Sequence, residues 1–348
     1  MDLGKLDTRG GEWLRGDGPR SDIVISSRVR LARNVAGYPF PNRASAQERS
    51  EIAERLRGPL MSLGLTSRPF YIDLDGLDKL QARFLVERHL ISRELESAKG
   101  PRSVCFGSDE VVSIMINEED HLRIQAVRSS LALNEAYDIA VSVDRNLEQE
   151  VEFAASNRFG YLTSCPTNVG TGLRASVMLH LPALVHLKQI ERLFRAANRT
   201  GHTVRGFYGE GTMASGDLYQ ISNQVTLGRT EDETLAGLRE MLPRFIAYEE
   251  QCREELGTRG RLKLEDKCHR ALAILRAART LSSDEAMKYL SAVRLGAVLG
   301  ILDEVSLPRV SELFVLTQPA HLQKLEGRPL EPEERDTRRA AFVRACLS

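Results

Sequence analysis

The stretch NEEDHLRIQ, residues 117–125, directly follows an apolar, β-rich run at residues 111–116, and a second such run covers residues 122–127. Both runs have the length and composition of short strands. Between them the chain places two glutamates, an aspartate and a histidine, and an arginine follows at once. Charged groups are costly to bury without partners, so this turn predicts a site at which charges are required.

The composition of the chain is that of an ordinary globular protein. Its 348 residues, 42% hydrophobic and 28% charged, predict two domains. Lysine plus arginine equals aspartate plus glutamate at 48 each. This neutral balance argues against a dedicated nucleic-acid-binding or membrane-surface protein.

Targeting segments and covalent cross-links are not expected. The amino terminus has no apolar segment of the signal-peptide kind, and no run reaches the roughly 20 apolar residues of a membrane span. The five cysteines are scattered, with no C-x-x-C pair: Cys105, Cys165, Cys252, Cys268 and Cys346. We therefore expect a reduced, cytoplasmic protein with neither a disulfide framework nor a protein-held metal site.

The pattern of apolar residues predicts an α+β domain over residues 1–255 and an all-helical domain over residues 256–348, because aromatic and β-branched residues thin out in the second part. The expected strands are Ser21–Leu31, Val111–Ile116, Leu122–Val127, Leu173–Leu181, Thr203–Tyr208 and Leu218–Leu227. The expected helices are Leu77–Ser97, Leu131–Gln149, Ala183–Asn198, Leu235–Leu256, Leu264–Leu281, Ser283–Leu299, Pro308–Leu316 and Glu331–Cys346.

Arginines beside short strands indicate the chemistry. Arg28 and Arg30 alternate, so they project to one face if this segment is a strand. Arg123 follows the acidic turn, and Arg174 and Arg205 lie beside glycines. A single arginine of this kind is usually paired with a surface carboxylate. Five at strand ends favour a shared anion site instead, because guanidinium forks suit phosphate oxygens.

An anion site of this kind predicts phosphoryl transfer. The chain has neither the P-loop motif nor the H-R-D and D-F-G motifs of protein kinases, and residues 170–175 fit G-x-G-x-x-A without the helix that should follow. Arginines and Mg²⁺ stabilise the charge on a transferring phosphoryl group. A carboxylate must orient the nucleophile and take its proton, and Glu118, Glu119 and Glu210 are the candidates. The alternative is that one or two of them pair with the site arginines.

Four motifs together resemble a known family. They are SSRVRLARN (residues 26–34), NEEDHLRIQ (117–125), YLTSCPTNVGTGLRASVMLHLPAL (161–184) and RGFYGEG (205–211). In this order they resemble the catalytic domain of phosphagen (ATP:guanidino) kinases, over roughly residues 22–256. The C-P-T-N-x-G-T and N-E-E-D-H stretches are the most specific. The resemblance implies a central antiparallel sheet flanked by helices, ATP as phosphoryl donor and Mg²⁺ with it.

Two features resemble the bacterial protein-arginine kinase branch of this family. The S-R-V-R motif begins at residue 27, so we expect no helical domain ahead of the catalytic one, and hence an open site. Residues 335–340, RDTRRA, match the R-D-x-x-R-A motif of that branch. The implied activity is ATP-dependent phosphorylation of arginine side chains in proteins. The alternatives are a kinase for a free guanidino compound and a phosphoarginine-binding adaptor without catalysis.

The resemblance implies roles for individual residues. The ATP-binding positions it implies are Ser27, Arg28, Val29, Arg30, Leu31, His89, Arg123, Arg174, Ala175, Ser176, Val177, Met178, Arg205, Gly206, Phe207, Tyr208 and Gly209. Glu119 and Glu210 would hold the substrate guanidinium, and Cys165 would lie beside it. Without the family, His89 reads as a helix-surface histidine and Cys165 as a small buried hydrophobe.

In the helical domain the implied phosphoarginine-binding residues are Arg335, Asp336, Thr337, Arg338, Arg339 and Ala340. The alternative there is a solvated, self-paired helix face. The resemblance also implies partners: protein substrates with exposed arginines, an activator protein, a repressor of heat-shock genes and a Clp-type protease, together with a homodimer and allosteric tuning by phosphoarginine. Direct binding of nucleic acid is not expected.

Overall fold

The computed structural model describes residues 11–206 and 215–348 and is built on an eight-stranded sheet in the order β2-β3-β4-β5-β1-β8-β10-β9. Every neighbouring pair of strands is antiparallel. The strands are β1 Val24–Arg33, β2 Pro69–Asp73, β3 Ser103–Gly107, β4 Val112–Ile116, β5 Leu122–Ser129, β8 Leu173–His180, β9 His202–Gly206 and β10 Leu218–Asn223, and β6 Ala155–Ser156 pairs with β7 Gly160–Tyr161 in a separate hairpin.

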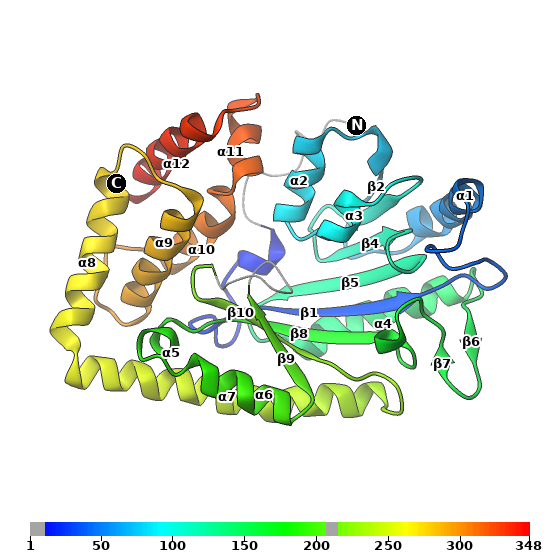
Figure 1. The fold of residues 1–348 in the computed structure, drawn as a ribbon, viewed down its shortest axis with the longest axis horizontal. Helices are drawn as coiled ribbons and strands as arrows, with labels where there is room; N and C mark the ends of the chain where they lie inside the picture. The colour runs from blue at the N-terminus through cyan, green and yellow to red at the C-terminus, as the bar shows by residue number, and fades with distance from the viewer. Residues whose placement is uncertain (1–10, 207–214) are drawn as a thin grey trace.

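Helices cover the sheet and then continue as a helical region on one side of it (Figure 1). The helices are α1 Ala46–Ser62, α2 Lys79–Glu87, α3 Arg93–Ser97, α4 Leu133–Glu148, α5 Pro182–His186, α6 Ile190–Arg199, α7 Glu231–Arg259, α8 Arg261–Ala277, α9 Ser283–Val298, α10 Leu307–Leu316, α11 Pro319–Glu326 and α12 Pro332–Leu347. The expected fold class, an antiparallel α+β domain followed by helices, is confirmed. The expected boundary at residue 255 lies inside α7.

The period-two alternation of β1 divides the sheet into two faces. Val29 and Leu31 are fully buried in the main core, on the side where α4 packs against β1 and β5. Their neighbours Arg28 and Arg30 therefore point to the other face. A second, smaller core lies under α2 and α3 and includes Phe84, Leu85 and Met115, together with Ala320 from the helical region.

Two segments that were each expected to form one continuous helix are in fact interrupted. The expected helix 77–97 is two helices, because His89 has a left-handed backbone (φ 61°) between α2 and α3. The expected helix 183–198 is likewise divided into α5 and α6, with Lys188 at φ 56° between them. A continuous helix excludes such positive φ values. Apolar periodicity continues across both breaks, so the pattern alone does not reveal them.

Candidate active site

A cleft of about 660 Å³ opens over the face of the sheet that α4 does not cover. That volume is in the range of ordinary ligand sites. The residues that line it come from six strands (β1, β4, β5, β8, β9 and β10), from α2, α3 and the turn between them, from the β4–β5 turn and from the loop after β7. All five predicted arginines line this one cleft: Arg28, Arg30, Arg123, Arg174 and Arg205. The structure therefore brings the five arginines together in one cleft, and their binding of a shared anion stays a prediction.

Strand register explains how residues far apart in sequence meet here. Arg30 of β1 pairs with Gln125 of β5 on one side and with Arg174 of β8 on the other. Directly opposed residues of an antiparallel sheet share a face, so these three side chains form a row across the cleft floor. Ala32 pairs with Arg123 in the next row.

Two guanidinium groups on the cleft floor donate to neutral side chains. Arg28 donates to the Gln220 side chain (Nη2–Oε1 2.7 Å), and Arg174 donates to Ser222 (Nη2–Oγ 3.2 Å). Burial and the positive charges of Arg174 and Arg123 lower the pKa of Arg28 to about 10. Burial and the same kind of like-charge contacts hold the pKa of Arg30 well below its usual value. Such a floor favours binding of a polyanion.

The charged turn contains two kinds of residue. Asp120 and His121 are buried, and Asp120 accepts from Asn34 (Nδ2–Oδ1 2.7 Å) and from the main chain of Ser164 (2.7 Å). His121 Nδ1 accepts from the main-chain N–H of Val35 (3.0 Å). These two residues therefore tie the β4–β5 turn to the end of β1 and to the loop that carries Cys165.

The two glutamates of the turn differ in freedom. Glu118 has a side chain 2% exposed, forms an ion pair with Arg123 (2.6 Å) and accepts a hydrogen bond from Ser92. Glu119 is 41% exposed and lies 3.1 Å from the same arginine, with Asn168 at 3.4 Å. An exposed ion pair is weak, so Glu119 can exchange partners at little cost. Glu118 instead holds Arg123 in place.

Cys165 lies at the start of a short 3₁₀ turn, Pro166–Asn168, and lines the same cleft as Glu119. Its thiol is partly exposed and contacts the Thr167 hydroxyl (Sγ–Oγ1 2.9 Å). Three of the other cysteines, Cys105, Cys252 and Cys268, are buried in the core, and burial raises the pKa of each. Cys165 is thus the cysteine of the described residues that faces the cleft.

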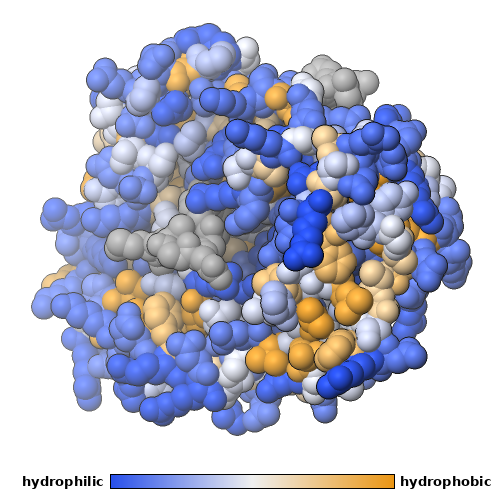
Figure 2. Space-filling view, turned by 45° about the vertical axis from the view of Figure 1, so that its right-hand side comes forward, coloured by the Kyte–Doolittle hydropathy of each residue, from blue (hydrophilic) through white to orange (hydrophobic). Residues whose placement is uncertain are grey.

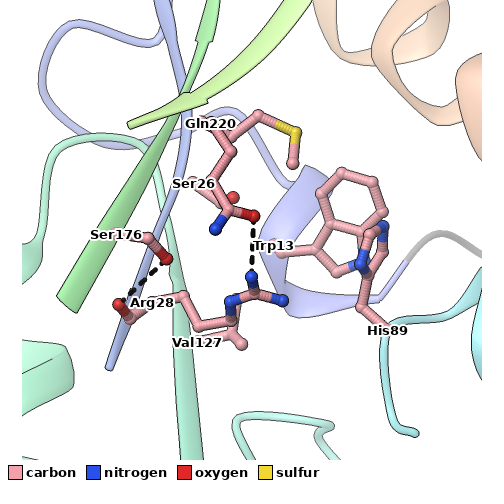
Figure 3. Close-up of a pocket in the computed structure, with 8 residues that line it drawn as sticks. Trp13, Ser26, Arg28, His89, Val127, Ser176 and Gln220 are labelled. Carbon is pink, nitrogen blue, oxygen red and sulfur yellow. Dashed lines mark hydrogen bonds between the residues drawn. The ribbon is translucent and has the colours of Figure 1, made fainter. Parts of the chain in front are cut away.

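His89 lies on the α2–α3 turn beside a small cavity of about 20 Å³ that adjoins the cleft (Figure 3). Its ring contacts the Trp13 ring edge-on, with centroids 4.5 Å apart. Trp13 belongs to the short 3₁₀ helix η2, Glu12–Leu14. Burial and the charges of Arg28 and Arg93 lower the pKa of His89 to about 3, so the imidazole is neutral. The interpretation of His89 as a helix-surface residue is wrong.

The expected ATP-binding segments are divided between the two faces of the sheet. Ser176 and Met178 line the small cavity beside Arg28. The side chains that point to the α4 face are those of Ser27, Val29, Leu31, Ala175 and Val177. Gly206 ends β9, and Phe207, Tyr208, Gly209 and Glu210 lie outside the described residues.

Several cleft residues were not predicted. Gln220 accepts from Arg28, and alternation along the strand 218–223 could have placed it on the polar face. Asn168 lies within the quoted motif and contacts Glu119. Ser92 and Arg93 also line the cleft, but nothing in their local sequence distinguishes them from a charged helix start.

The R-D-x-x-R-A segment lies on α12, away from the cleft. Arg339 is 1% exposed and donates to the main-chain oxygens of Thr317 (Nε, 2.8 Å) and Leu281 (Nη1, 2.7 Å), and to Asp336 (2.5 Å). Ala340 is fully buried, whereas Arg335, Asp336, Thr337 and Arg338 are at least partly exposed. The alternative interpretation, a helix face exposed to solvent, is therefore wrong for Arg339, which is buried.

Two further properties concern residues 11–206 and 215–348. No group of three His, Cys, Asp or Glu side chains there could hold a metal ion. Within the same residues, no helix has both the length and the apolar character that crossing a bilayer requires.

Comparisons with known proteins agree with this geometry. The family model for the ATP:guanido phosphotransferase C-terminal catalytic domain matches residues 51–252, and the model for the protein-arginine kinase McsB C-terminal domain matches residues 261–348. A protein-arginine kinase of Symbiobacterium thermophilum is 48% identical over 339 residues, covering 97% of this chain and 96% of the relative. One of Halothermothrix orenii is 46% identical over 336 residues, with the same coverage.

Solved structures are similar to the chain as well. The duplicated taurocyamine kinase of Schistosoma mansoni with bound transition-state-analogue components has a TM-score of 0.62 and 27% identity, covering 72% of this chain. This chain spans 35% of that duplicated protein. A lombricine kinase crystal structure has a TM-score of 0.58 and 26% identity, covering 71% of this chain and 72% of the other.

Proposed function

The chain belongs to the protein-arginine kinase family of ATP:guanido phosphotransferases, and we propose that it transfers the γ-phosphoryl group of ATP to arginine side chains of proteins. One observation carries the proposal. A cleft floor rich in arginine adjoins a wall that presents an accessible carboxylate, Glu119, and a partly exposed thiol, Cys165. The floor suits the phosphates of ATP and the wall suits a guanidinium cation.

Arg28, Arg30 and Arg174 bind the ATP phosphates in this proposal, since they lie together on β1 and β8 and Arg30 meets mainly the positive charges of its neighbours. Arg123 lies between the floor and the acidic wall, held by Glu118. Guanidinium groups placed in advance stabilise the negative charge of the transferring phosphoryl group. The arginine side chains thus both bind ATP and lower the barrier.

Glu119 orients the substrate and takes its proton. A free guanidinium is a cation without an available lone pair, so it must be aligned and lose a proton as it attacks. Glu119 leaves Arg123, accepts from the substrate guanidinium and receives that proton. The attacking nitrogen forms the bond to the γ-phosphorus while the bond to the ADP oxygen breaks. Orientation of this kind can contribute about 7–11 kcal/mol. Glu210 would supply a second carboxylate.

Mg²⁺ would enter on the nucleotide. The described residues do not form a protein cage for a metal, and Mg²⁺ commonly binds through substrate phosphates with one or two carboxylates. Among the described residues that line the cleft, the carboxylates are Glu94, Glu118 and Glu119, of which Glu118 is already paired with Arg123. When bound, the ion neutralises phosphate charge.

The helical region is proposed to bind phosphoarginine at Arg335 and Asp336, which are partly exposed on α12. Arg339, which donates to Asp336, would orient that carboxylate toward a guanidino group. Dimerisation, the activator, the heat-shock repressor, the Clp-type protease and a cytoplasmic location stay predictions.

The test is phosphoryl transfer from Mg-ATP to an unfolded arginine-rich protein and, separately, to free arginine. We expect acid-labile label on the protein, because a P–N bond is acid-labile and a serine phosphate is not. Label on free arginine alone would replace the proposal with a small-molecule kinase.

Glu119→Gln is the matched variant, since it keeps the shape of the side chain but removes the base. It should lose transfer while retaining ATP binding. Transfer at the wild-type rate would remove Glu119 from the mechanism.

A further inference from the structure

Helices α2 and α11 lie side by side (Figure 1). Glu87, the last residue of α2, is a buried carboxylate that contacts the amino-terminal end of α11. Its two oxygens accept from the main-chain N–H of Ala320 at 3.0 and 3.1 Å. One of them also accepts from the main-chain N–H of His321 at 3.0 Å and from its Nδ1 at 2.9 Å. One side chain of the catalytic region thus meets three donors of the helical region.

This contact is stronger than an ordinary surface pair. The first N–H groups of a helix have no partners within the helix, and the helix dipole adds positive potential there. A carboxylate that accepts from them makes charge-assisted hydrogen bonds. Glu87 and His321 are both buried, and the Phe84 ring packs on the imidazole with centroids 4.6 Å apart. If the carboxylate were removed, buried donors would lose their acceptor.

The same few residues of α2 form a wall of the cleft. Val86 precedes Glu87 and His89 follows two residues later, and both line the cleft. The His89 carbonyl accepts from Gln125 of β5 (2.7 Å), and its main-chain N–H donates to Val86 (2.9 Å). Arg88 donates to Glu110 (Nε–Oε1 2.8 Å). A displacement of Glu87 therefore moves His89, because the turn between them is short and hydrogen-bonded.

The helical region also holds the segment that leads into α11. Arg339 of α12 donates to the carbonyl of Thr317, three residues before Ala320. The segment before α11 is therefore bonded to a buried arginine of α12, and the first turn of α11 is bonded to the carboxylate of α2. In this way the position of α12 is connected to the cleft through two buried polar contacts.

We propose that Glu87 is a positioning residue for ATP binding: by holding the start of α11 it places His89 and the α2–α3 turn against the nucleotide. The docking of the helical region then sets the affinity of the catalytic cleft for ATP. This inference rests on the proposed binding of ATP in the cleft.

Glu87→Gln tests the inference, because its amide nitrogen would face N–H donors in place of an acceptor. We expect the KM for ATP and the Kd for Mg-ADP to rise at least about fivefold, as for a moderate coupling between sites, with kcat at saturating ATP changed less. Trp13, the single tryptophan of the chain, contacts His89 and reports its position. Its fluorescence emission should change in the folded variant.

Glu249→Gln is the matched control. Glu249 is also a buried carboxylate at a helix start, where it accepts from the main-chain N–H groups of Ala183 (3.1 Å) and Leu184 (3.0 Å) of α5. It does not line the cleft. This variant should lose stability but keep the wild-type KM for ATP and the wild-type Trp13 emission.

The outcomes are distinct. If Glu87→Gln leaves KM and Trp13 emission unchanged, or if Glu249→Gln changes them equally, the positioning role is overturned. If Glu87→Gln does not fold, His321→Leu removes one donor and leaves the two main-chain donors, and it should raise KM in the same direction. A wild-type protein that neither binds Mg-ADP nor transfers phosphoryl groups would refute the proposed function instead.

Discussion

Arg30 and Arg33 lie on the same strand, three positions apart, yet they meet opposite surroundings. Arg33 is 1% exposed, and both of its terminal nitrogens have partners: Nη2 forms an ion pair with Asp144 (2.7 Å), and Nη1 donates to the carbonyls of Ala32 and Thr171 (2.9 Å each). The Tyr161 ring lies 3.5 Å from the same guanidinium. The buried Nε has no hydrogen-bond partner in either arginine, but Arg30 meets mainly the positive charges of the other cleft arginines, with Glu118 as a weaker opposing charge. An arginine with internal partners supports the fold, whereas one facing like charges awaits a ligand.

The largest effect should come from Arg30→Met. We expect transfer to fall by about 10³-fold, the scale for an arginine that stabilises a transferring phosphoryl group. The melting temperature should stay the same or rise, because a like-charge contact is removed. Phosphoryl transfer and a thermal melt, measured on the same preparation, check both parts. A large fall in melting temperature would show that Arg30 supports the fold after all.

Arg33→Met should give the reverse result. It leaves Asp144 buried without its charge partner, so we expect the free energy of unfolding to fall by about 3 kcal/mol. Urea denaturation measures that loss. Phosphoryl transfer per folded molecule should remain near the wild-type rate. A loss of transfer in folded protein would show that Arg33 also serves catalysis, against the proposed difference between the two arginines.

Ligand binding should sharpen the contrast further. At a concentration 100 times its Kd, Mg-ADP should stabilise the wild-type protein by about 2.7 kcal/mol, because it binds the folded state alone. Arg30→Met should lose this stabilisation and Arg33→Met should keep it. Thermal melts with and without nucleotide measure the difference.

The smallest effect concerns pH. His180 is buried, its Nδ1 accepts from Arg294 (2.8 Å), and burial with the charges of Arg294 and Arg253 holds its pKa well below the usual value. The unfolded state, with a pKa of about 6.5, binds more protons, so this stability is complete above pH 6.5 and is lost as pH falls below it. Between pH 7.5 and 5.5 we expect a loss of about 1 kcal/mol for this histidine.

The pH effect can be assigned with one variant. Urea midpoints at the two pH values should differ less in His180→Gln than in the wild type. An equal pH dependence in both proteins would place it at other groups.

The arginines of the cleft could be predicted largely from the sequence, because the pattern that indicates them is local. Alternation along one strand placed Arg28 and Arg30 on one face, and the motif order brought Arg123 and Arg174 to neighbouring strands. Their register then set them side by side. The break at His89 was not predictable, because it depends on contacts with Gln125 and Trp13, which are distant in sequence.

The sequence by itself determined the α+β class, the helical second part, the charged β4–β5 turn and the arginines that face one cleft, because these follow from periods of two and 3.6 residues and from motifs. Only the tertiary structure decided which charges serve binding and which serve folding. Asp120, Glu87, Arg33 and Arg339 look like surface charges in the sequence and are in fact paired groups largely out of water. The physical reason is that the cost of burying a charge depends on its partners. Except for the Ala32 carbonyl beside Arg33 and the Asp336–Arg339 pair, those partners come from distant parts of the chain.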